Sequence, residues 1–203
     1  MSKPKPFLRS VISPGTAQSK NIQWTVFVRN FYDLYSKRKE YKDRKLIGFS
    51  GDQMYEVVAD VANYKDFLPF CRKSIIIEHN PDKFMKAKLE IGFPPVIESY
   101  TSHVTLVKPH LVKAMNRDAQ LFDYLKTTWK FSPGLKSNPQ SCIIDFHVCF
   151  QFKSIFHSNL AHMFFDKVVK QMEGAFFKEA ARRYGRASLP SHRLSATASE
   201  QHS

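Results

Sequence analysis

The sequence has little of what three common classes of protein require. Its three cysteines, Cys71, Cys142 and Cys149, form no CxxC pair, and no secretory leader is evident, which argues against a disulfide framework and fits a reducing compartment. Seven glycines leave little material for a glycine-rich phosphate loop. The longest apolar runs are far shorter than the ~20 residues of a membrane-spanning helix. We therefore expect neither a disulfide scaffold, nor a phosphate-loop protein, nor a transmembrane helix.

The residue types that usually build active sites and metal sites are scattered. The chain has eight histidines, and His157 and His162 are five positions apart on a predicted helix instead of the four that align two ligands. Cys142 and Cys149 are predicted on opposite faces of one strand, which disfavours joint ligation of a metal. No nucleophile and base stand out as a pair. The sequence thus predicts no catalytic residue, no metal and no cofactor, and a protein that is not an enzyme.

The net charge of +13 is unevenly distributed along the chain. Residues 1–45 carry eleven basic and three acidic residues, a net +8, whereas residues 46–185 carry eighteen and fourteen, a net +4. A nucleic-acid-binding fold usually holds its basic excess inside the folded domain. Because most of the excess here precedes the predicted domain, the charge argues against a nucleic-acid partner and indicates targeting instead.

The two ends of the chain differ in composition from its middle. Residues 1–32 are basic and rich in Ser and Thr and contain no acid, which is typical of a mitochondrial targeting leader. An ordinary disordered N-terminus is the alternative. Residues 33–43 predict a charged connector, and residues 186–203 a polar, disordered tail. The folded domain is expected between them, over residues 44–185.

The order of elements in this domain can be predicted from its periodicity and turn signals. We expect a first strand over Arg44–Phe49, a helix with Asp52 as its N-cap, and a short helix over Tyr64–Phe67. A long helix is expected over residues 155–184. Six antiparallel strands are expected between the helices, over residues 72–79, 84–92, 96–108, 111–118, 124–131 and 141–153.

Apolar residues alternate with polar ones along several strands, which indicates a sheet with one buried face. The inward rows comprise Met85, Ala87, Leu89 and Ile91, then Leu125, Thr127, Trp129 and Phe131, then Cys142, Ile144, Phe146, Val148, Phe150 and Phe152. An apolar stripe on the last helix comprises Phe156, Leu160, Phe164, Val168, Met172 and Phe176. These rows contain no charge. The pattern predicts an α+β helix-grip fold, in which a curved antiparallel sheet of about seven strands wraps around a long C-terminal helix.

Two turns carry apolar residues where surface turns are normally polar. We expect them to form a pocket mouth or a membrane-contacting rim, together with the basic residues beside them. The candidate residues for this mouth are Lys65, Phe67, Leu68, Phe70, Arg72, Lys73, Phe93, Pro94 and Pro95. The alternative is that these turns fold back onto the core. The pattern also leaves open whether the inward rows fill the space under the helix or line a hollow.

Several motifs of the domain resemble one known family. They include Tyr64-Lys65-Asp66-Phe67-Leu68-Pro69-Phe70, Leu89-Glu90-Ile91-Gly92-Phe93-Pro94-Pro95 and Phe164-Phe165-Asp166-Lys167-Val168-Val169. On these motifs, residues 44–184 resemble the mitochondrial coenzyme Q-binding START-domain family, part of the polyketide cyclase/START-like superfamily. The resemblance implies a START/Bet v 1-like fold that binds coenzyme Q (ubiquinone) or its polyprenylated precursors. It also implies a lipid chaperone or carrier, peripheral to the matrix side of the inner mitochondrial membrane, that serves respiration and coenzyme Q biosynthesis, with the biosynthetic complex as a candidate partner.

A cavity that binds such a lipid would lie between the sheet and the long helix. We expect it to be lined by Leu89, Ile91, Tyr100, Trp129, Phe146, Val148, Phe164, Val168 and Met172. Tyr100 and Trp129 are also the candidate donors to the quinone head. Two other functions remain open at this point. One is a polyketide aromatase/cyclase-like enzyme, because helix-grip relatives include such enzymes; the other is a ribosome- or RNA-associated module, against which the modest charge of the domain speaks.

Overall fold

The computed structural model describes residues 38–81, 83–93, 96–116, 118–120, 122–153 and 165–195. The expected leader, the first part of the connector and residues 154–164 and 196–203 lie outside the described residues. The strands are β1 (Arg38–Ile47), β2 (Cys71–Asn80), β3 (Phe84–Phe93), β4 (Val96–Val107), β5 (Leu111–Asn116), β6 (Phe122–Pro133), β7 (Cys142–Phe152) and β8 (His192–Arg193). The helices are α2 (Gly51–Ala59), the 3-10 helix η1 (Val61–Asn63), α3 (Tyr64–Phe67) and α5 (Phe165–Tyr184). Among the described residues, no helix is long and apolar enough to cross a membrane.

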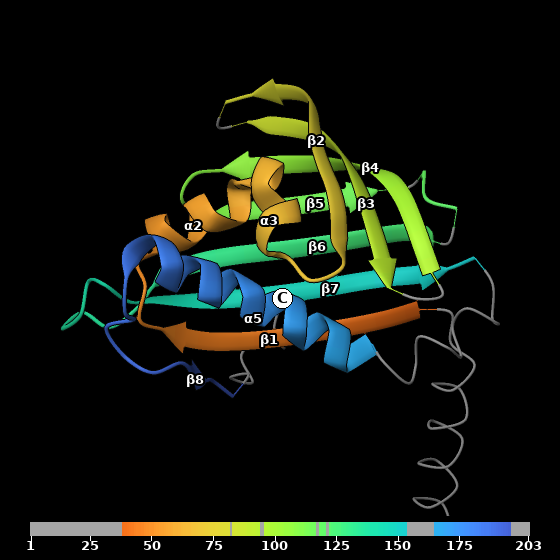
Figure 1. Cartoon of the computed structure of the whole chain (residues 1–203). Coiled ribbons are helices and arrows are strands. Elements are labelled where there is room, and N and C mark those ends of the chain that lie inside the picture. Colours follow the sequence, from red (N-terminus) through yellow and green to blue (C-terminus); the bar gives the residue numbers. More distant parts are fainter. Residues whose placement is uncertain are drawn as a thin grey trace, which may run out of the picture. The chain divides into compact units, whose positions relative to one another are not determined.

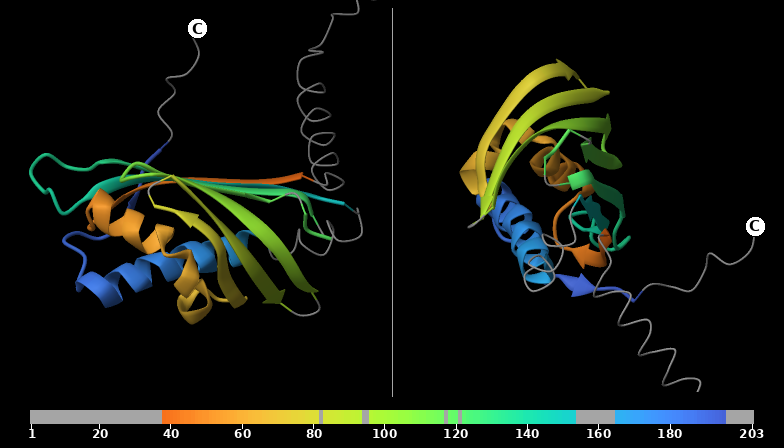
Figure 2. Two further views of the ribbon diagram at one scale, coloured as in Figure 1. Left: turned by 90° about the horizontal axis from the view of Figure 1, so that it is seen from above. Right: turned by 90° about the vertical axis from the view of Figure 1, so that its right-hand side faces the viewer.

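The strands form one antiparallel sheet in the order β2-β3-β4-β5-β6-β7-β1-β8. Figure 1 shows α2, α3 and α5 on the same face of this sheet, and Figure 2 shows the sheet bending around them. From β2 to β7, neighbours in the sheet are also consecutive in the chain, whereas β1 lies beside β7. The predicted α+β helix-grip fold is confirmed, and the described sheet has eight strands where about seven were expected.

Helix α2 begins at a capping box formed by Ser50 and Gln53. The Ser50 hydroxyl accepts a hydrogen bond from the Gln53 amide nitrogen at 3.2 Å, and the Gln53 side chain accepts one from the Ser50 amide nitrogen at 2.9 Å. Two amide groups that would otherwise lack partners at the helix start are thereby satisfied. The expectation that Asp52 is the N-cap is therefore wrong. Asp52 lies in the first turn, where its negative charge interacts favourably with the positive end of the helix dipole.

Strand β1 begins at Arg38, earlier than the predicted Arg44, so residues 38–43 lie in the sheet and not in a connector. It pairs with β7 along its whole length. Its alternation is hidden by its charges, because the inward Asp43 is buried as a charged residue beside the buried Tyr41, whose hydroxyl donates to it at 3.0 Å. When the inward positions of a strand are polar and form hydrogen bonds, its sequence lacks the alternation of apolar and polar residues by which a strand is predicted.

Part of the expected disordered tail is also ordered. His192 and Arg193 form β8 and pair with β1. Just before β8, the chain packs closely over Gly48, where a Cβ atom would come within 2.4 Å of the Leu189 backbone nitrogen. Only glycine permits so close an approach of two backbone segments. Residues 186–195 therefore belong to the folded domain.

The sheet forks between β4 and β5. In the described part of the chain, β4 pairs with β3 over nearly its whole length but with β5 only over His103–Val107. Beyond the fork, the loop after β5 takes the place of that strand, since the Asp118 carboxylate accepts hydrogen bonds from the Thr101 amide at 3.0 and 3.1 Å. Glu98 likewise accepts one from the Gln120 amide. The strands β2, β3 and β4 thus diverge from the rest of the sheet, as Figure 2 shows, and deepen its concave face.

Helix α5 is fastened to the domain by charged contacts in its middle and at its C-terminal end. The buried Glu173 carboxylate lies 2.7 Å from Lys45 Nζ on β1. Near the end of the helix, Arg183 lies 2.6 Å from Asp60, which follows α2, and 2.7 Å from Glu179. The apolar face of α5 is therefore held toward the sheet by ion pairs that lie beside the cavity and not inside it.

The Lys45–Glu173 pair gives a first test of how α5 is held. Replacing Lys45 by Met leaves the Glu173 carboxylate buried without its cation, and the Lys45 contact with the Phe177 ring, 5.4 Å from its centroid, is lost as well. We expect the free energy of unfolding to fall by about 2–3 kcal/mol, less than the ~3–5 kcal/mol of a fully buried pair because the Lys45 side chain is 20% exposed. Urea unfolding at pH 7 measures it. The control is Lys42→Met, because Lys42 pairs with Glu40 on the exposed face and should cost less than about 1 kcal/mol; equal losses would contradict the assignment.

The C-terminal end of α5 gives a second test, in its pH dependence. Hydrogen bonds from Arg182 and Arg183 lower the pKa of Glu179 to about 2, whereas a glutamate in an unfolded chain titrates near ~4.3. Glu179 therefore contributes stability above about pH 4.3 that is lost as the pH falls toward the folded pKa. We expect Glu179→Gln to be less stable than the wild type at pH 6 and to approach it near pH 2. A gap in urea midpoint that stays constant over this range would refute the linkage.

Candidate ligand cavity

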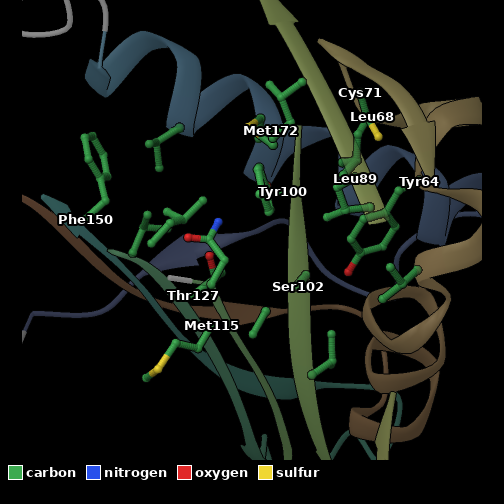
Figure 3. A pocket seen from close by; sticks show the side chains of 18 of the residues that line it. Tyr64, Leu68, Cys71, Leu89, Tyr100, Ser102, Met115, Thr127, Phe150 and Met172 are labelled. Atoms are coloured by element: carbon green, nitrogen blue, oxygen red, sulfur yellow. The ribbon is translucent and has the colours of Figure 1, made fainter. Parts of the chain in front are cut away.

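A cavity lies between the concave face of the sheet and α5, and Figure 3 shows side chains of both surrounding it. Its volume is about 210 Å³. An apolar cavity of about 150 Å³ already holds benzene, whereas typical ligand pockets measure about 300–1,000 Å³. The cavity therefore has room for one ring or a short prenyl segment, and a long polyprenyl tail would extend beyond it.

Small side chains in the middle of the sheet create this space. Ala87 on β3 lies opposite Ser102 on β4, and Ala114 on β5 lies opposite both Val104 on β4 and Thr127 on β6. All five face the concave side, where Val104, Ser102 and Ala87 are buried. Ser102, Val104, Ala114 and Thr127 line the cavity, so larger side chains at these four positions would reduce its volume. The question that the sequence left open is thus answered in favour of a hollow lining.

Most of the residues predicted to line the cavity do so. The structure places Leu89, Ile91, Tyr100, Trp129, Phe146, Val148, Val168 and Met172 around it. Phe164 lies outside the described residues. Period-two alternation and the helical stripe thus located part of the apolar walls, whereas Val61, Val104, Val112 and Phe122 also line the cavity and were not predicted to do so.

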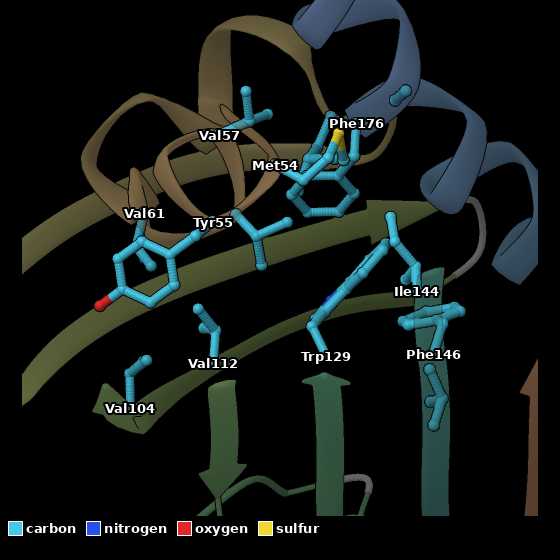
Figure 4. Packing of buried hydrophobic residues seen from close by; sticks show 14 of the residues in the cluster. Met54, Tyr55, Val57, Val61, Val104, Val112, Trp129, Ile144, Phe146 and Phe176 are labelled. Atoms are coloured by element: carbon cyan, nitrogen blue, oxygen red, sulfur yellow. The ribbon is translucent and has the colours of Figure 1, made fainter. Parts of the chain in front are cut away.

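Aromatic rings close one end of the cavity. Figure 4 shows Trp129 between Val112 and Phe146 on the sheet, with Phe176 of α5 and Met54 of α2 above them. The ring centroids of Trp129 and Phe146 are 4.2 Å apart, and those of Trp129 and Phe176 are 4.9 Å apart. Packing of this kind leaves no space for a ligand between the rings. The indole of Trp129 is thus a wall of the cavity at this end.

The apolar turn residues that were expected together at the mouth of the cavity do not lie together in the structure. Leu68 is buried and lines the cavity itself. Phe67 packs edge-to-face on Tyr64 and on Phe176, with centroids 5.7 and 5.5 Å apart, so it folds back onto the core. Phe70 is partly buried, with φ at 69°. The side chain of Phe93 and the residues Pro94 and Pro95 lie outside the described residues.

The basic residues beside this turn are exposed and make ion pairs. Lys65 lies 3.4 Å from Asp66, and Arg72 and Lys73 lie 3.6 and 3.0 Å from Glu90. Their charges are therefore partly neutralised by neighbours on the same surface. Contact of these residues with a membrane stays a prediction.

Three polar residues of the lining were missed by the sequence interpretation. Glu98, Ser102 and Asn116 are all buried and all line the cavity, although the inward rows identified from sequence contained no charge. A signal for them existed, because Val104 in β4 and Val112 in β5 continue at every second residue into these positions. Strand β4 obscured this signal, because polar residues stand at both inward and outward positions in its middle, from Glu98 to His103.

The remaining titratable groups of the lining are neutral at pH 7. Burial raises the pKa of the Cys71 thiol to about 11, and burial also raises the pKa of the Tyr64 and Tyr100 hydroxyls above the usual range. Loss of hydration disfavours each charged form. Within the described segments, no group of three or more His, Cys, Asp or Glu side chains could hold a metal ion. Apart from Glu98, the cavity therefore offers apolar surface and uncharged donors and acceptors.

Comparisons with known proteins agree with this geometry. Residues 47–177 match the model of the family described as polyketide cyclase / dehydrase and lipid transport. The coenzyme Q-binding protein COQ10 homolog B, mitochondrial, of Xenopus laevis is 47% identical over 178 residues, which cover 87% of this chain and 72% of that protein. The mitochondrial coenzyme Q-binding protein COQ10 of Drosophila melanogaster is 48% identical over 164 residues, which cover 81% and 67%.

More distant similarities concern other functions. The ribosome association toxin RatA of Escherichia coli is 31% identical over 127 residues, which cover 63% of this chain and 75% of the toxin. The crystal structure of the Zhui aromatase/cyclase superposes with a TM-score of 0.59 at 18% identity, over 74% of this chain and 98% of the enzyme. This last likeness shows the fold alone. From the extent of the matches to the family model and to the two COQ10 proteins, the chain belongs to the polyketide cyclase / dehydrase and lipid transport family and, within it, to the mitochondrial coenzyme Q-binding proteins.

Proposed function

We propose that this protein binds coenzyme Q or its polyprenylated precursors in the cavity between the sheet and α5. The observation that carries the proposal is the cavity itself, hollow and almost wholly apolar, in a chain whose relatives at 47 and 48% identity are named coenzyme Q-binding proteins. The ligand-binding residues on this proposal are those of the apolar lining described above, with Leu68 added to them.

The energetics of prenyl chains favour a carrier of this kind. Exposing each CH₂ group to water costs about 0.8 kcal/mol, so one isoprene unit is worth a few kcal/mol. A carrier must therefore match the bilayer in apolarity, so that moving the tail from lipid to protein is nearly neutral. The walls formed by Leu89, Val148 and Val168 offer such surroundings. The protein then acts as a lipid chaperone or carrier for respiration and for coenzyme Q biosynthesis, and not as an enzyme.

The proposed location is the matrix side of the inner mitochondrial membrane, where the protein is peripheral and meets the coenzyme Q biosynthetic complex. The mitochondrial names of the relatives and the basic, acid-free composition of residues 1–32 support this location. The exposed side chains of Lys65, Arg72 and Lys73 beside α3 are the proposed contact with the anionic leaflet.

The RatA similarity favours a second candidate, a ribosome- or RNA-associated module. It is weaker than the first because the identity is lower and because residues 46–185 carry a net charge of only +4. Strong, salt-sensitive binding of RNA by the purified chain would favour it over lipid binding. Turnover of a quinone precursor by the purified chain would instead favour an enzyme.

Filling the cavity tests the proposal directly. Ala114→Phe places a ring in the middle of the cavity, and quinone that co-purifies with the chain is expected to fall by about tenfold or more, because displacing even two CH₂ groups costs about 1.6 kcal/mol. The matched control is Thr105→Phe, which adds the same ring at an exposed position of β4. Mass spectrometry of extracted lipid measures both variants. Undiminished quinone in folded Ala114→Phe would place the ligand elsewhere.

The size of the cavity predicts a dependence on tail length. Affinity is expected to rise by about tenfold or more from a tail-less quinone to quinones with one and two isoprene units, and to level off for longer tails, because the cavity of about 210 Å³ holds only a short segment. Quenching of Trp129 fluorescence by the quinone ring reports binding, in a Trp24→Phe background that leaves one tryptophan. Affinity that does not change with tail length would rule out burial of the tail.

A further inference from the structure

Asn116, the last residue of β5, carries a buried side-chain amide that forms no hydrogen bond with the described part of the chain. Its exposed fraction is 2%, and among the described residues neither its Oδ1 nor its Nδ2 has a hydrogen-bond partner. Buried side-chain polar groups in proteins are nearly always satisfied, and the exceptions require an explanation. The position of this amide supplies one, since Asn116 lines the cavity.

The surroundings of Asn116 offer little that could satisfy it. The residue opposite it on β6 is Leu125, and the next inward residue on its own strand is Ala114. Strand β4 no longer pairs with β5 at this level, because the described pairing ends at His103 opposite Met115. Asn116 thus lines the cavity beyond the end of the β4–β5 pairing, and its amide forms no hydrogen bond with the described residues.

An amide in this position is suited to one part of the proposed ligand. Its Nδ2 carries two donors and its Oδ1 accepts, whereas a prenyl tail has no polar atom. The quinone ring bears carbonyl and methoxy oxygens, all acceptors without charge. The cavity volume of about 210 Å³ also suits one ring better than a long tail.

We infer that Asn116 is a specificity-determining residue that donates a hydrogen bond to a ring oxygen of the quinone, an inference that rests on the proposed function. The ring then lies in the cavity near the fork between β4 and β5, the first part of the tail follows it along the apolar walls, and the rest of a long tail extends beyond the cavity. Tyr100 on β4 also lines the cavity, and its hydroxyl is a second candidate donor. Trp129, the other donor expected from the sequence, belongs to the packed aromatic end instead.

The test compares two probes on the full chain. One is a ubiquinone with a single isoprene unit, and the other is a benzene ring with the same prenyl tail and no ring oxygen. Asn116→Leu is expected to weaken quinone binding about tenfold, the effect of one buried hydrogen bond, and to leave hydrocarbon binding unchanged or tighter. The ligand-free variant should unfold at higher urea concentration, because an unsatisfied amide is removed. The control is Asn80→Leu, at the exposed end of β2, which should change neither affinity.

The outcomes separate the inference from the proposed function. If Asn116→Leu changes both affinities equally, or neither, while Ala114→Phe abolishes binding of both probes, the cavity binds lipid but the assignment of Asn116 is wrong. If the wild type binds neither probe, the proposed function itself fails. If Asn116→Leu does not fold, the side-chain amide NMR signals of Asn116 in the wild type decide: they should shift with the quinone and not with the hydrocarbon, and signals that respond alike to both overturn the inference.

Discussion

The gap between the sheet and α5 depends on where the helix is held, because its contacts with the strands lie beside the cavity and at one end of it. Ion pairs hold it, through Lys45 and Glu173 beside the cavity and through Arg183 and Asp60 at its C-terminal end. Aromatic packing of Phe176 seals only one end of the space. Attachment beside the cavity and at one end leaves the space next to Ser102 and Ala114 unfilled. A helix held only by apolar contact would gain stability by closing that gap.

Much of this fold could be predicted because apolar periodicity reports which face of an element is buried. The short helix Tyr64–Phe67 and the six strands from β2 to β7 lie within a few residues of their predicted bounds. The errors fall where long-range partners decide the structure. Strand β1 was placed too late because Asp43 is buried in a polar cluster, and β8 was missed because two residues acquire strand structure only by pairing with β1. Local sequence carries no record of such partners.

The candidate site divides in the same way. Part of its apolar walls followed from alternation, and the resemblance to a family supplied the expected ligand. The role of the small residues Ser102 and Ala114 in the cavity lining could not be recognised, because it depends on which residues lie opposite them. The fork between β4 and β5 was equally hidden, since it arises where the loop at Asp118 replaces a strand. The shape of the cavity depends on the register in which the strands pair, and the sequence of one strand alone does not determine that register.

Stability and binding make opposite demands on this interior. Filling the space around Ala114 and replacing the Asn116 amide by an apolar group would both strengthen the domain in the absence of ligand. Both changes would also remove a feature that a binding cavity needs and a packed core does not: the first removes the empty space, and the second removes the hydrogen-bond donor that faces it. The domain therefore loses some stability to the unfilled space and to the unsatisfied amide. Burial also raises the pKa of Tyr100 and of Cys71, which keeps these groups of the lining neutral. The single carboxylate, Glu98, is directed to the Gln120 amide. An interior of this composition selects a guest that is apolar, uncharged and able to accept a hydrogen bond at one end, which is the chemistry of a prenylated quinone.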